Sequence, residues 1–353
     1  MLINKIKLSN FRNYESQEII FGKDINVFYG DNAQGKTNII ESIFMAAFGK
    51  SFRTNKDKEI IQNGKDYTKL ELYFEDSNRE NKIELRISNS NGKEVYVNGV
   101  KINRLSELLG KINVVLFTPD DISILKDGPS VRRRFLDMLI GQIRQNYIYN
   151  LNQYLRILEE RNNYLKDNKL TEGLLQIYDE KLTEYAEIVY NYRRDYINKI
   201  KNYINDVHSK ITDNNENLRI EYKSDFENKE QFINLLKKSR NNDLFKGYTT
   251  KGIHRDDFAM FVNDKEMSIY GSQGQNRTAV LSLKLCELNI IRDEIGESPV
   301  LLLDDFMSEL DEKRRLNFLK NIDKIQVVIT CTDIMENKKY TIYKVSNGNI
   351  AQN

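Results

Sequence analysis

The alternation of apolar and polar residues first identifies several β-strands. Period-two alternation runs through residues 69–76, 82–90 and 93–101, and the pairs Asn91-Gly92 and Asn98-Gly99 fall between or within these runs. Asn-Gly pairs favour the tight turns of β-hairpins, so this region predicts an antiparallel sheet. Residues 257–271 alternate in the same way and predict a later hairpin.

A long helical region separates these two sets of strands. From residue 129 to 211, apolar residues recur three or four positions apart in two stripes, from Leu136 to Leu165 and from Leu175 to Val207. The polar segment KDNKLTEG divides the stripes. The spacing predicts an antiparallel helix pair or a small bundle. With a rise of about 1.5 Å per residue, each helix would be on the order of 50 Å long.

A third pattern is a short apolar run, residues 25–28, followed by a glycine-rich segment and by helical spacing from Ile39 to Ala47. The segment has the form G-x-x-x-x-G-K-[ST], which is the P-loop pattern. Its glycines permit positive φ, its lysine charge suits phosphate, and its threonine hydroxyl can bind Mg²⁺. The helix N-terminus adds a site for an anion. We therefore predict a nucleotide site formed by Gly30, Asp31, Asn32, Ala33, Gln34, Gly35, Lys36, Thr37 and Asn38.

A second apolar strand, Val300–Leu303, ends in Asp304 and Asp305. If this strand lies next to the P-loop strand, Asp304 would hold Mg²⁺ together with Thr37, as in a Walker B motif. Asp305 would then face the attacking water. A strand that merely ends in an acidic turn is the alternative, and the P-loop upstream argues against it.

The long separation of these two motifs indicates an insertion. We predict an α/β fold in which residues 1–125 and 245–353 form a discontinuous head, with a mixed sheet and an antiparallel flank. Residues 126–244 would form an inserted, mainly helical arm.

Composition adds boundaries to this picture. The chain has 353 residues, of which 40% are hydrophobic, enough for a substantial core. Apolar runs are too short to span a bilayer and no leader is evident, so we expect a cytoplasmic protein without membrane contact. Cys286 and Cys331 lie in apolar runs and are expected to be buried thiols. With 54 basic and 52 acidic residues, any site for a polyanion must be a local patch.

A further helix start follows the later hairpin. Ser272, Gln273, Gly274 and Gln275 lead into a helical pattern that continues to Ile291. Taken alone, Ser272 is typical of a helix N-cap, with the rest a turn. Together with the Walker motifs, however, this amide-rich start resembles the signature motif of ABC-type ATPases, which would add Ser272 to Gln275 to the nucleotide site.

Seven segments spread over the chain resemble the RecF family of bacterial recombination-mediator ATPases. They are IKLSNFRNY, GDNAQGKTNIIESI, GKSFRT, LFTPDDISILKDGPSVRRRFLD, GIHRDDF, GSQGQNRT and LLLDDFMSELD. The resemblance implies an ABC-type ATPase head, similar to those of SMC proteins and Rad50, with a short helical arm.

The resemblance also implies a function. RecF-like proteins bind ATP with Mg²⁺ as a homodimer, in which the signature motif of one subunit meets the γ-phosphate held by the other. Such a dimer would clamp DNA without sequence specificity at gaps between single and double strands. It would act with RecR and RecO to load RecA, in the nucleoid-associated cytoplasm.

Individual positions carry over from the family. Asp305 falls where ABC ATPases place a catalytic glutamate, and with Lys36 and Ser272 it would form the catalytic set. Ser308–Asp311 matches the D-loop, and Arg12 matches an arginine that lies close to the nucleotide in SMC-like heads.

Other positions depart from the family pattern. Arg53 and Thr54 match a His-Arg-Thr stretch in which Phe52 replaces histidine, and Pro119–Asp121 occupies the Q-loop. The segment ITCTD, with Thr332, offers no switch histidine. A short acid at 305 and the missing histidine predict slow ATP hydrolysis. The resemblance implies that DNA stimulates this hydrolysis.

Metal and DNA sites outside these motifs have weaker signals. His254 stands beside two acids, but no third ligand has useful spacing, so we do not expect a metal there. The densest basic groups are the candidates for DNA phosphates, although most such groups are solvated faces. No interleaving of aromatic and basic residues predicts base readout. The candidates are Arg132, Arg133, Arg134, Arg193, Arg194, Lys237, Lys238 and Arg240.

Two other functions fit parts of the sequence. A transporter's nucleotide-binding subunit would normally lack the long arm and carry a switch histidine. A nucleotide switch that acts only on protein partners is harder to exclude, because the net charge of +2 gives no global basic signal. Salt-dependent DNA binding would separate this switch from a clamp.

Overall fold

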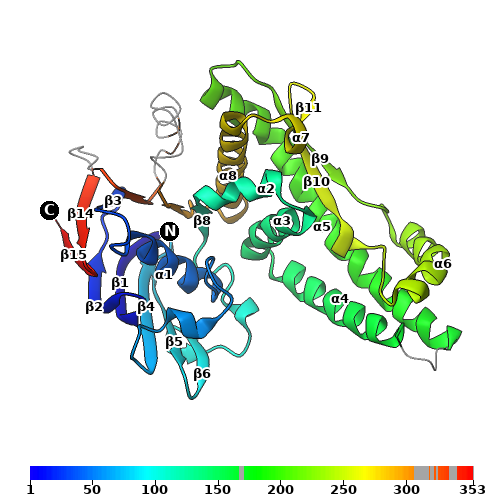
Figure 1. Ribbon diagram of the computed structural model, residues 1–353, viewed down its shortest axis with the longest axis horizontal. Coiled ribbons are helices and arrows are strands. Elements are labelled where there is room, and N and C mark those ends of the chain that lie inside the picture. Colours follow the sequence, from blue (N-terminus) through cyan, green and yellow to red (C-terminus); the bar gives the residue numbers. More distant parts are fainter. Residues whose placement is uncertain (167–170, 306–317, 319–321, 323–324, 334–339, 353) are drawn as a thin grey trace. The chain divides into compact units, whose positions relative to one another are not determined.

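The computed structural model describes residues 1–166, 171–305, 318, 322, 325–333 and 340–352 (Figure 1). The chain forms two compact units. Unit 1 comprises residues 1–122, 210–213 and 277–353, and unit 2 comprises residues 123–209 and 214–276. Each unit has its own sheets and helices, and each is described by itself.

Unit 1 contains a six-stranded, mostly parallel sheet in the order β15-β14-β3-β13-β12-β8. All pairs are parallel except that of β14 with β15. The strands β8, β12 and β13 are buried along their whole length, which explains their apolar sequences, interrupted only by Thr330 in β13. The bounds are β3 Ile25–Tyr29, β8 Val114–Phe117, β12 Val300–Leu303, β13 Val327–Cys331, β14 Tyr340–Ser346 and β15 Asn349–Gln352.

The second sheet of unit 1 is antiparallel, in the order β2-β1-β4-β5-β6-β7. Its hairpins β5–β6 and β6–β7 turn at Asn91-Gly92 and Asn98-Gly99, where Gly92 and Gly99 have φ of +72° and +83°. The predicted antiparallel flank is therefore confirmed. The bounds are β1 Leu2–Phe11, β2 Tyr14–Ile20, β4 Tyr67–Glu75, β5 Glu80–Ser88, β6 Gly92–Val97 and β7 Val100–Lys101.

Helix α1 (Lys36–Phe48) packs between the two sheets, against β13 and β8 of one and β4 and β5 of the other. All residues from Ile39 to Phe48 are buried, so the helix is covered on every side. The P-loop, at the carboxyl end of β3, is thus followed by a helix that is buried from Ile39 to Phe48. Unit 1 also contains the short 3₁₀ helices η1 (Asp57–Ile60), η2 (Leu105–Glu107) and η3 (Pro119–Ile122).

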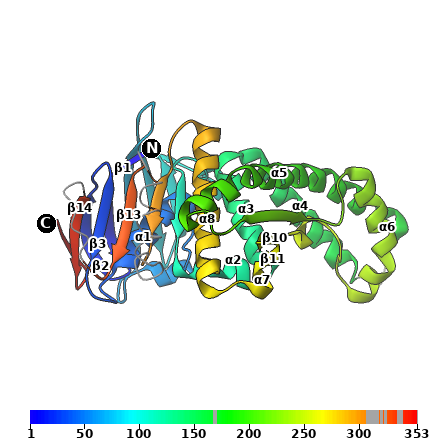
Figure 2. The same ribbon diagram turned by 90° about the horizontal axis from the view of Figure 1, so that it is seen from above.

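Unit 2 is mainly helical, as the apolar stripes predict. Its helices α4 and α5 run side by side (Figures 1 and 2). The first stripe is divided between two helices, because Arg144 is extended, with φ −127° and ψ 94°. The apolar spacing continues across this break. The break could therefore not be located from the periodicity of apolar residues. The bounds are α2 Ser123–Lys126, α3 Pro129–Ile143, α4 Gln145–Tyr164, α5 Glu172–Thr212, α6 Lys229–Lys246 and α7 Met267–Tyr270.

The boundary between the units differs from the one expected at residue 245. Strand β10 (Asp257–Val262) pairs with β9 (Leu218–Lys223) and β11 (Lys265–Glu266), so residues 245–276 group with the helical unit. The helical pattern did not reveal this small sheet, because its strands β9 and β10 are distant in sequence. The short η4 (Ile253–Arg255) precedes β10, and α8 (Gln273–Ile295) begins in unit 2 and continues in unit 1.

Two further expectations concern burial and membranes. Both cysteines, Cys286 and Cys331, are free and buried. Among the helices that the structure describes, none is both long and apolar enough to cross a bilayer.

Candidate nucleotide site

The segment between β3 and α1 has the backbone of a phosphate-binding loop. Gly30 and Gly35 have φ of +154° and +115°, and Ala33 has φ of +65°. A Cβ atom on Gly30 would lie 2.3 Å from the carbonyl oxygen of Val345, and one on Gly35 would lie 2.5 Å from Asn13 Nδ2. Both glycines are therefore required by space as well as by conformation.

The loop is accessible and contains the ammonium group of Lys36. Asp31, Asn32 and Ala33 are exposed, while residues 34–38 are half-buried. Lys36 Nζ donates to the carbonyl oxygens of Gly30 at 2.5 Å and Asp31 at 2.9 Å, so its charge lies within the loop. The first turn of α1 carries no acidic residue, which leaves its positive end available to an anion.

Hydrogen bonds from two other segments hold this loop. Asn13 Nδ2 donates to Gln34 O at 2.9 Å, and the hydroxyl of Tyr14 donates to Gly35 O at 3.0 Å. The backbone N–H of Asn347, in the β14–β15 turn, donates to Gln34 Oε1 at 2.6 Å. Sequence reasoning missed Asn13 and Asn347, although the first lies beside Arg12 in a quoted motif.

Asp304 and Thr37 meet, as predicted, but not through adjacent strands. Strand β13 lies between β3, which precedes the P-loop, and β12, which precedes Asp304. The prediction that these two strands are direct neighbours is therefore wrong. Thr330 on β13 fills the interval: its hydroxyl donates to Asp304 Oδ1 at 2.7 Å. Thr37 Oγ1 donates to the same oxygen at 3.0 Å. Thr330 gave no signal in the sequence beyond its position two residues before Thr332.

The environment of Asp304 suits a divalent cation. Burial raises the pKa of its carboxyl, while the hydrogen bonds from Thr330 and Thr37 act in the opposite direction. A hydroxyl and a carboxylate oxygen are the ligands that Mg²⁺ accepts alongside nucleotide phosphates. A cation there would also offset the cost of burying the ionised acid. Thr37 and Asp304 therefore fit the predicted Mg²⁺ site.

Asp305 stands at the exposed end of β12, and its backbone has a φ of +47°. Its N–H donates to the Thr330 hydroxyl at 2.9 Å. Thr330 thus contacts both candidate acids, the side chain of one and the backbone of the next. The arrangement fixes the direction in which the chain leaves the strand.

Arg12 is engaged by a buried acid that the sequence analysis did not single out. Glu41 on α1 is fully buried and accepts from Arg12 Nε at 2.9 Å and NH2 at 2.6 Å. It also accepts from Ser51 Oγ at 2.5 Å and lies 3.4 Å from Arg53 NH1. Arg53 in turn donates to Asn38 Oδ1 at 2.8 Å, which connects this cluster to the P-loop helix.

The signature segment begins α8 with a capping box. Gln275 N donates to Ser272 Oγ at 3.3 Å, and Ser272 N donates to Gln275 Oε1 at 3.1 Å. The helix-cap interpretation is therefore correct for these two residues, and Gln275 Nε2 additionally donates to Glu216. Ser272 and Gln273 remain exposed. Capping uses Ser272 Oγ as an acceptor and leaves its hydroxyl proton for another acceptor.

The Q-loop segment and Thr332 lie in the described part of unit 1. Asp121, in the Q-loop segment, accepts from Thr118 N at 2.6 Å and lies 3.5 Å from Lys284 Nζ, whereas Asp120 is exposed. Thr332 follows β13 and is exposed. The D-loop residues Ser308–Asp311 lie outside the described residues.

The HRDD segment, residues 254–257, has structural partners in unit 2. His254 Nδ1 shares a hydrogen bond of 2.7 Å with Tyr154 OH, and burial lowers the pKa of His254 to about 4. Asp256 accepts from Tyr222 OH at 2.5 Å and from Ser224. No group of three or more His, Cys, Asp or Glu suited to a metal occurs in the described part of the chain.

Some of the basic candidates for DNA contact are engaged inside the fold and others are exposed. The prediction for Arg193 is withdrawn. Arg193 is 2% exposed and pairs with Asp137 at 2.9 Å, so its charge is neutralised inside the fold. Arg132 pairs with Asp257 at 2.5 Å, and Arg133 donates to Asp256 O. Arg193 is therefore unsuited to DNA, because a buried, paired guanidinium does not reach a phosphate.

The other candidates remain predictions. Arg240 is committed to Asp179 through hydrogen bonds of 2.9 and 3.1 Å. The exposed ones are Arg134, Arg194, Lys237 and Lys238.

Comparison with known proteins gives consistent matches over the full length. The family model described as RecF/RecN/SMC N terminal domain matches residues 2–351. The DNA replication and repair protein RecF of Clostridium tetani is 43% identical over 367 residues, covering 100% of both chains. That of Clostridium botulinum is 44% identical over 361 residues, covering 99% of both.

Solved structures match as well. A structure of the recombination mediator protein RecF with ATP has a TM-score of 0.93 and 38% identity, covering 99% of this chain and 97% of that one. An Smc head domain from Pyrococcus furiosus has a TM-score of 0.59 at 16% identity, covering 99% and 96% of the chains, and this likeness concerns the fold alone.

Proposed function

The chain belongs to the RecF family of DNA replication and repair proteins, with an ABC-type ATPase fold, and from this premise we propose that it is an ATP-dependent clamp on gapped DNA. The observation that carries the proposal is the cluster of Thr37, Thr330 and Asp304 beside the P-loop. It combines phosphate binding with a cation site in a chain whose relatives are named for DNA repair.

In this proposal the P-loop binds the phosphates of ATP. Backbone N–H groups from residues 30–38 and the Lys36 ammonium neutralise the phosphate oxygens. Thr37 and Asp304 would hold Mg²⁺, which supplies charge stabilisation during phosphoryl transfer. Asp305 acts as the acid nearest the attacking water, in the place of the family's catalytic glutamate. Thr330 keeps both acids in position.

The proposed clamp is a homodimer. Ser272 and the P-loop belong to different units, and Ser272 is exposed with a hydroxyl proton available. We propose that Ser272 and the α8 N-terminus of one copy donate to the γ-phosphate bound by the other. Each ATP would then be shared by two chains, which makes dimerisation depend on nucleotide.

Hydrolysis is proposed to be slow and stimulated by DNA. Asp305 has a shorter side chain than glutamate, and Thr332 offers no imidazole to orient water. Slow turnover suits a timer that maintains a closed state. We further propose that the closed dimer prefers junctions of single- and double-stranded DNA and works with RecR and RecO to load RecA.

Sedimentation equilibrium with ATP, ADP and no nucleotide tests the dimer. The protein should be dimeric only with ATP, and Lys36→Arg and Ser272→Arg should each remain monomeric. Mixing the two variants should restore partial association, because such a dimer contains one intact composite site. Monomers under every condition would contradict the shared-nucleotide dimer.

A further inference from the structure

Helix α6 of unit 2 has one face buried and one face exposed. Phe232, Leu236 and Asp243 point into the unit and are fully buried. The helix starts at a capped position, where Asn228 Oδ1 accepts from Gln231 N at 3.0 Å, and ends at Gly247 with φ +70°. Both ends are thus well defined.

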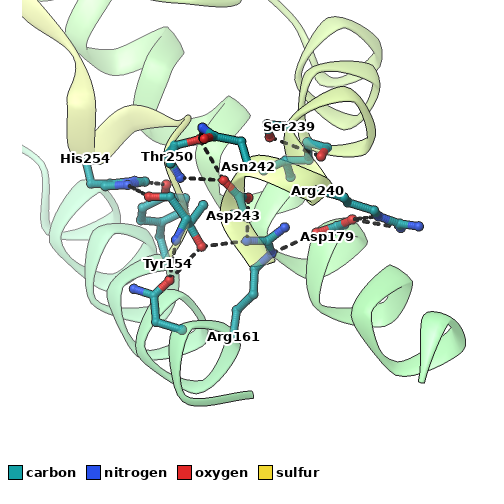
Figure 3. A network of polar contacts seen from close by, with 12 residues as sticks. Tyr154, Arg161, Asp179, Ser239, Arg240, Asn242, Asp243, Thr250 and His254 are labelled. Carbon is teal, nitrogen blue, oxygen red and sulfur yellow. Dashed lines mark hydrogen bonds and ion pairs between the residues drawn. The ribbon is translucent and has the colours of Figure 1, made fainter. Parts of the chain in front are cut away.

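Buried charges fix the inner face of α6 (Figure 3). Asp243 accepts from Arg161 NH1 on α4 at 2.9 Å and from Thr250 Oγ1 at 2.6 Å. Arg240 NH2 donates at 2.9 Å to Asp179 on α5, which also accepts from Arg161 Nε at 2.9 Å. Since these partners lie on two other helices, the orientation of α6 within the unit is strongly constrained.

The outer face of α6 consists of two rows of residues four positions apart. One row is Lys237, Asn241 and Phe245, and the other begins with Lys238 and ends with Lys246. All of these side chains are exposed, and Phe245 is 90% exposed, more than any other large hydrophobic residue in the described part of the chain. Asn242, which lies between Lys238 and Lys246 on the second row, donates to Thr250.

Between residues 237 and 246 no acid lies on either row, although the chain as a whole has 52 acidic and 54 basic residues; Glu230 lies on the second row, two turns before Lys238. In the part of the chain that the structure describes, Lys237, Lys238 and Lys246 form no ion pair. The helix dipole accounts for a cation in the last turn, at Lys246, but not for Lys237 and Lys238 in the middle of the helix. The outer face is therefore a positively charged surface of about 12 Å with one projecting aromatic ring.

This combination fits single-stranded nucleic acid better than a duplex or an apolar protein surface. Lysines neutralise phosphates without reading sequence, and amides of asparagine accept or donate to sugar and base edges. An exposed phenyl ring stacks on a base only where the base is unpaired, because duplex bases are already stacked. The neighbouring Leu244 and Tyr248 are only 38% and 39% exposed, against 90% for Phe245, so the apolar area beside the lysines is small for the centre of a protein interface.

We propose that the outer face of α6 binds the single strand of gapped DNA, with Phe245 stacking on a base and Lys237, Lys238 and Lys246 contacting phosphates. The proposal rests on the DNA clamp proposed above and specifies which strand this surface contacts. It assigns Phe245, which the sequence pattern did not distinguish from core aromatics.

Fluorescence anisotropy with single-stranded, duplex and gapped oligonucleotides, in a salt series with ATP, tests this surface. Phe245→Ala should lower affinity for single-stranded and gapped DNA by about five- to a hundred-fold, leaving duplex affinity unchanged. The matched control is Tyr149→Ala on α4, where the tyrosine is 51% exposed. The double variant Lys237→Gln/Lys238→Gln should reduce the magnitude of the salt slope by about 1.4. Its control is Lys181→Gln/Lys201→Gln on α5.

Each outcome decides the proposal. All substitutions are at exposed positions, so thermal unfolding should be unchanged and loss of binding would not reflect misfolding. If the wild type binds gapped DNA and both α6 variants behave like their controls, the surface serves another partner and this inference fails alone. If the wild type binds no DNA, the clamp and this inference fail together.

Discussion

At the scale of the residue, the nucleotide site depends on side chains to which no motif assigned a role. Lys36, Thr37 and Asp304 follow from local patterns, since each pattern has a direct chemical reason. Thr330 and Glu41 do not, because their roles arise from packing of strands and helices distant in sequence. A threonine in an apolar strand and a glutamate in an apolar helix are recognisable only once their partners are known.

Thr330→Val tests the proposed positioning of Asp304 and Asp305. Valine retains the volume but removes the hydroxyl that contacts both acids, so ATP turnover should fall about ten- to a hundred-fold. Mn²⁺ affinity in the presence of ATP, measured by paramagnetic resonance, should fall as well. Thr68→Val is the control, because Thr68 is also 1% exposed and donates only to Ser9 O. Equal turnover in the two variants would contradict the role of Thr330.

The buried His254 predicts a dependence of stability on pH. Burial lowers its pKa from 6.5 to about 4, so the folded state binds fewer protons than the unfolded state between these values. Stability is therefore lost as the pH falls through this window, by about 2 kcal/mol at pH 5. Urea unfolding at pH 7.5 and 5, compared with His254→Gln, should show the smaller acid loss in the variant. The same loss in both proteins would exclude His254 as the source.

At the scale of the element, the sequence predicted whether a segment is a helix or a strand better than it predicted which strands pair with each other. Residues 69–101 were recognised as antiparallel strands because their turns are marked by Asn-Gly pairs. The order of the parallel strands was not, because β13 between β3 and β12 comes from a later part of the chain. Likewise β9 and β10 pair across α6, which no local pattern indicates.

The buried ionic contacts of α4, α5 and α6 should be important for the stability of unit 2. In Arg161→Met, Asp243 loses a cation at a site where both side chains are 0% exposed. Loss of one partner from a buried pair costs about 3–5 kcal/mol in the free energy of unfolding. Arg156→Met on the same helix should cost less than about 0.5 kcal/mol, since Arg156 is 68% exposed and pairs with Glu160. Denaturant unfolding of the two variants measures the difference, and equal values would contradict it.

At the scale of the whole molecule, the chain combines an ATPase fold with a helical unit that carries the signature segment. The P-loop lies in unit 1 and Ser272 lies in unit 2. The family and fold were accessible from the sequence because seven motifs are spread along it. The candidate surface for DNA was not accessible in this way, since lysines are abundant throughout and only burial and ion pairing in the structure distinguish Arg193 from Lys237.

The most direct test of the clamp is the binding of labelled gapped DNA by anisotropy, with ATP, ADP or no nucleotide, over a range of salt concentrations. We predict that binding requires ATP, falls steeply with salt, and is lost in Lys36→Arg. Binding that is the same with every nucleotide, or absent even at low salt with ATP, would contradict the clamp and favour a nucleotide switch that acts on protein partners.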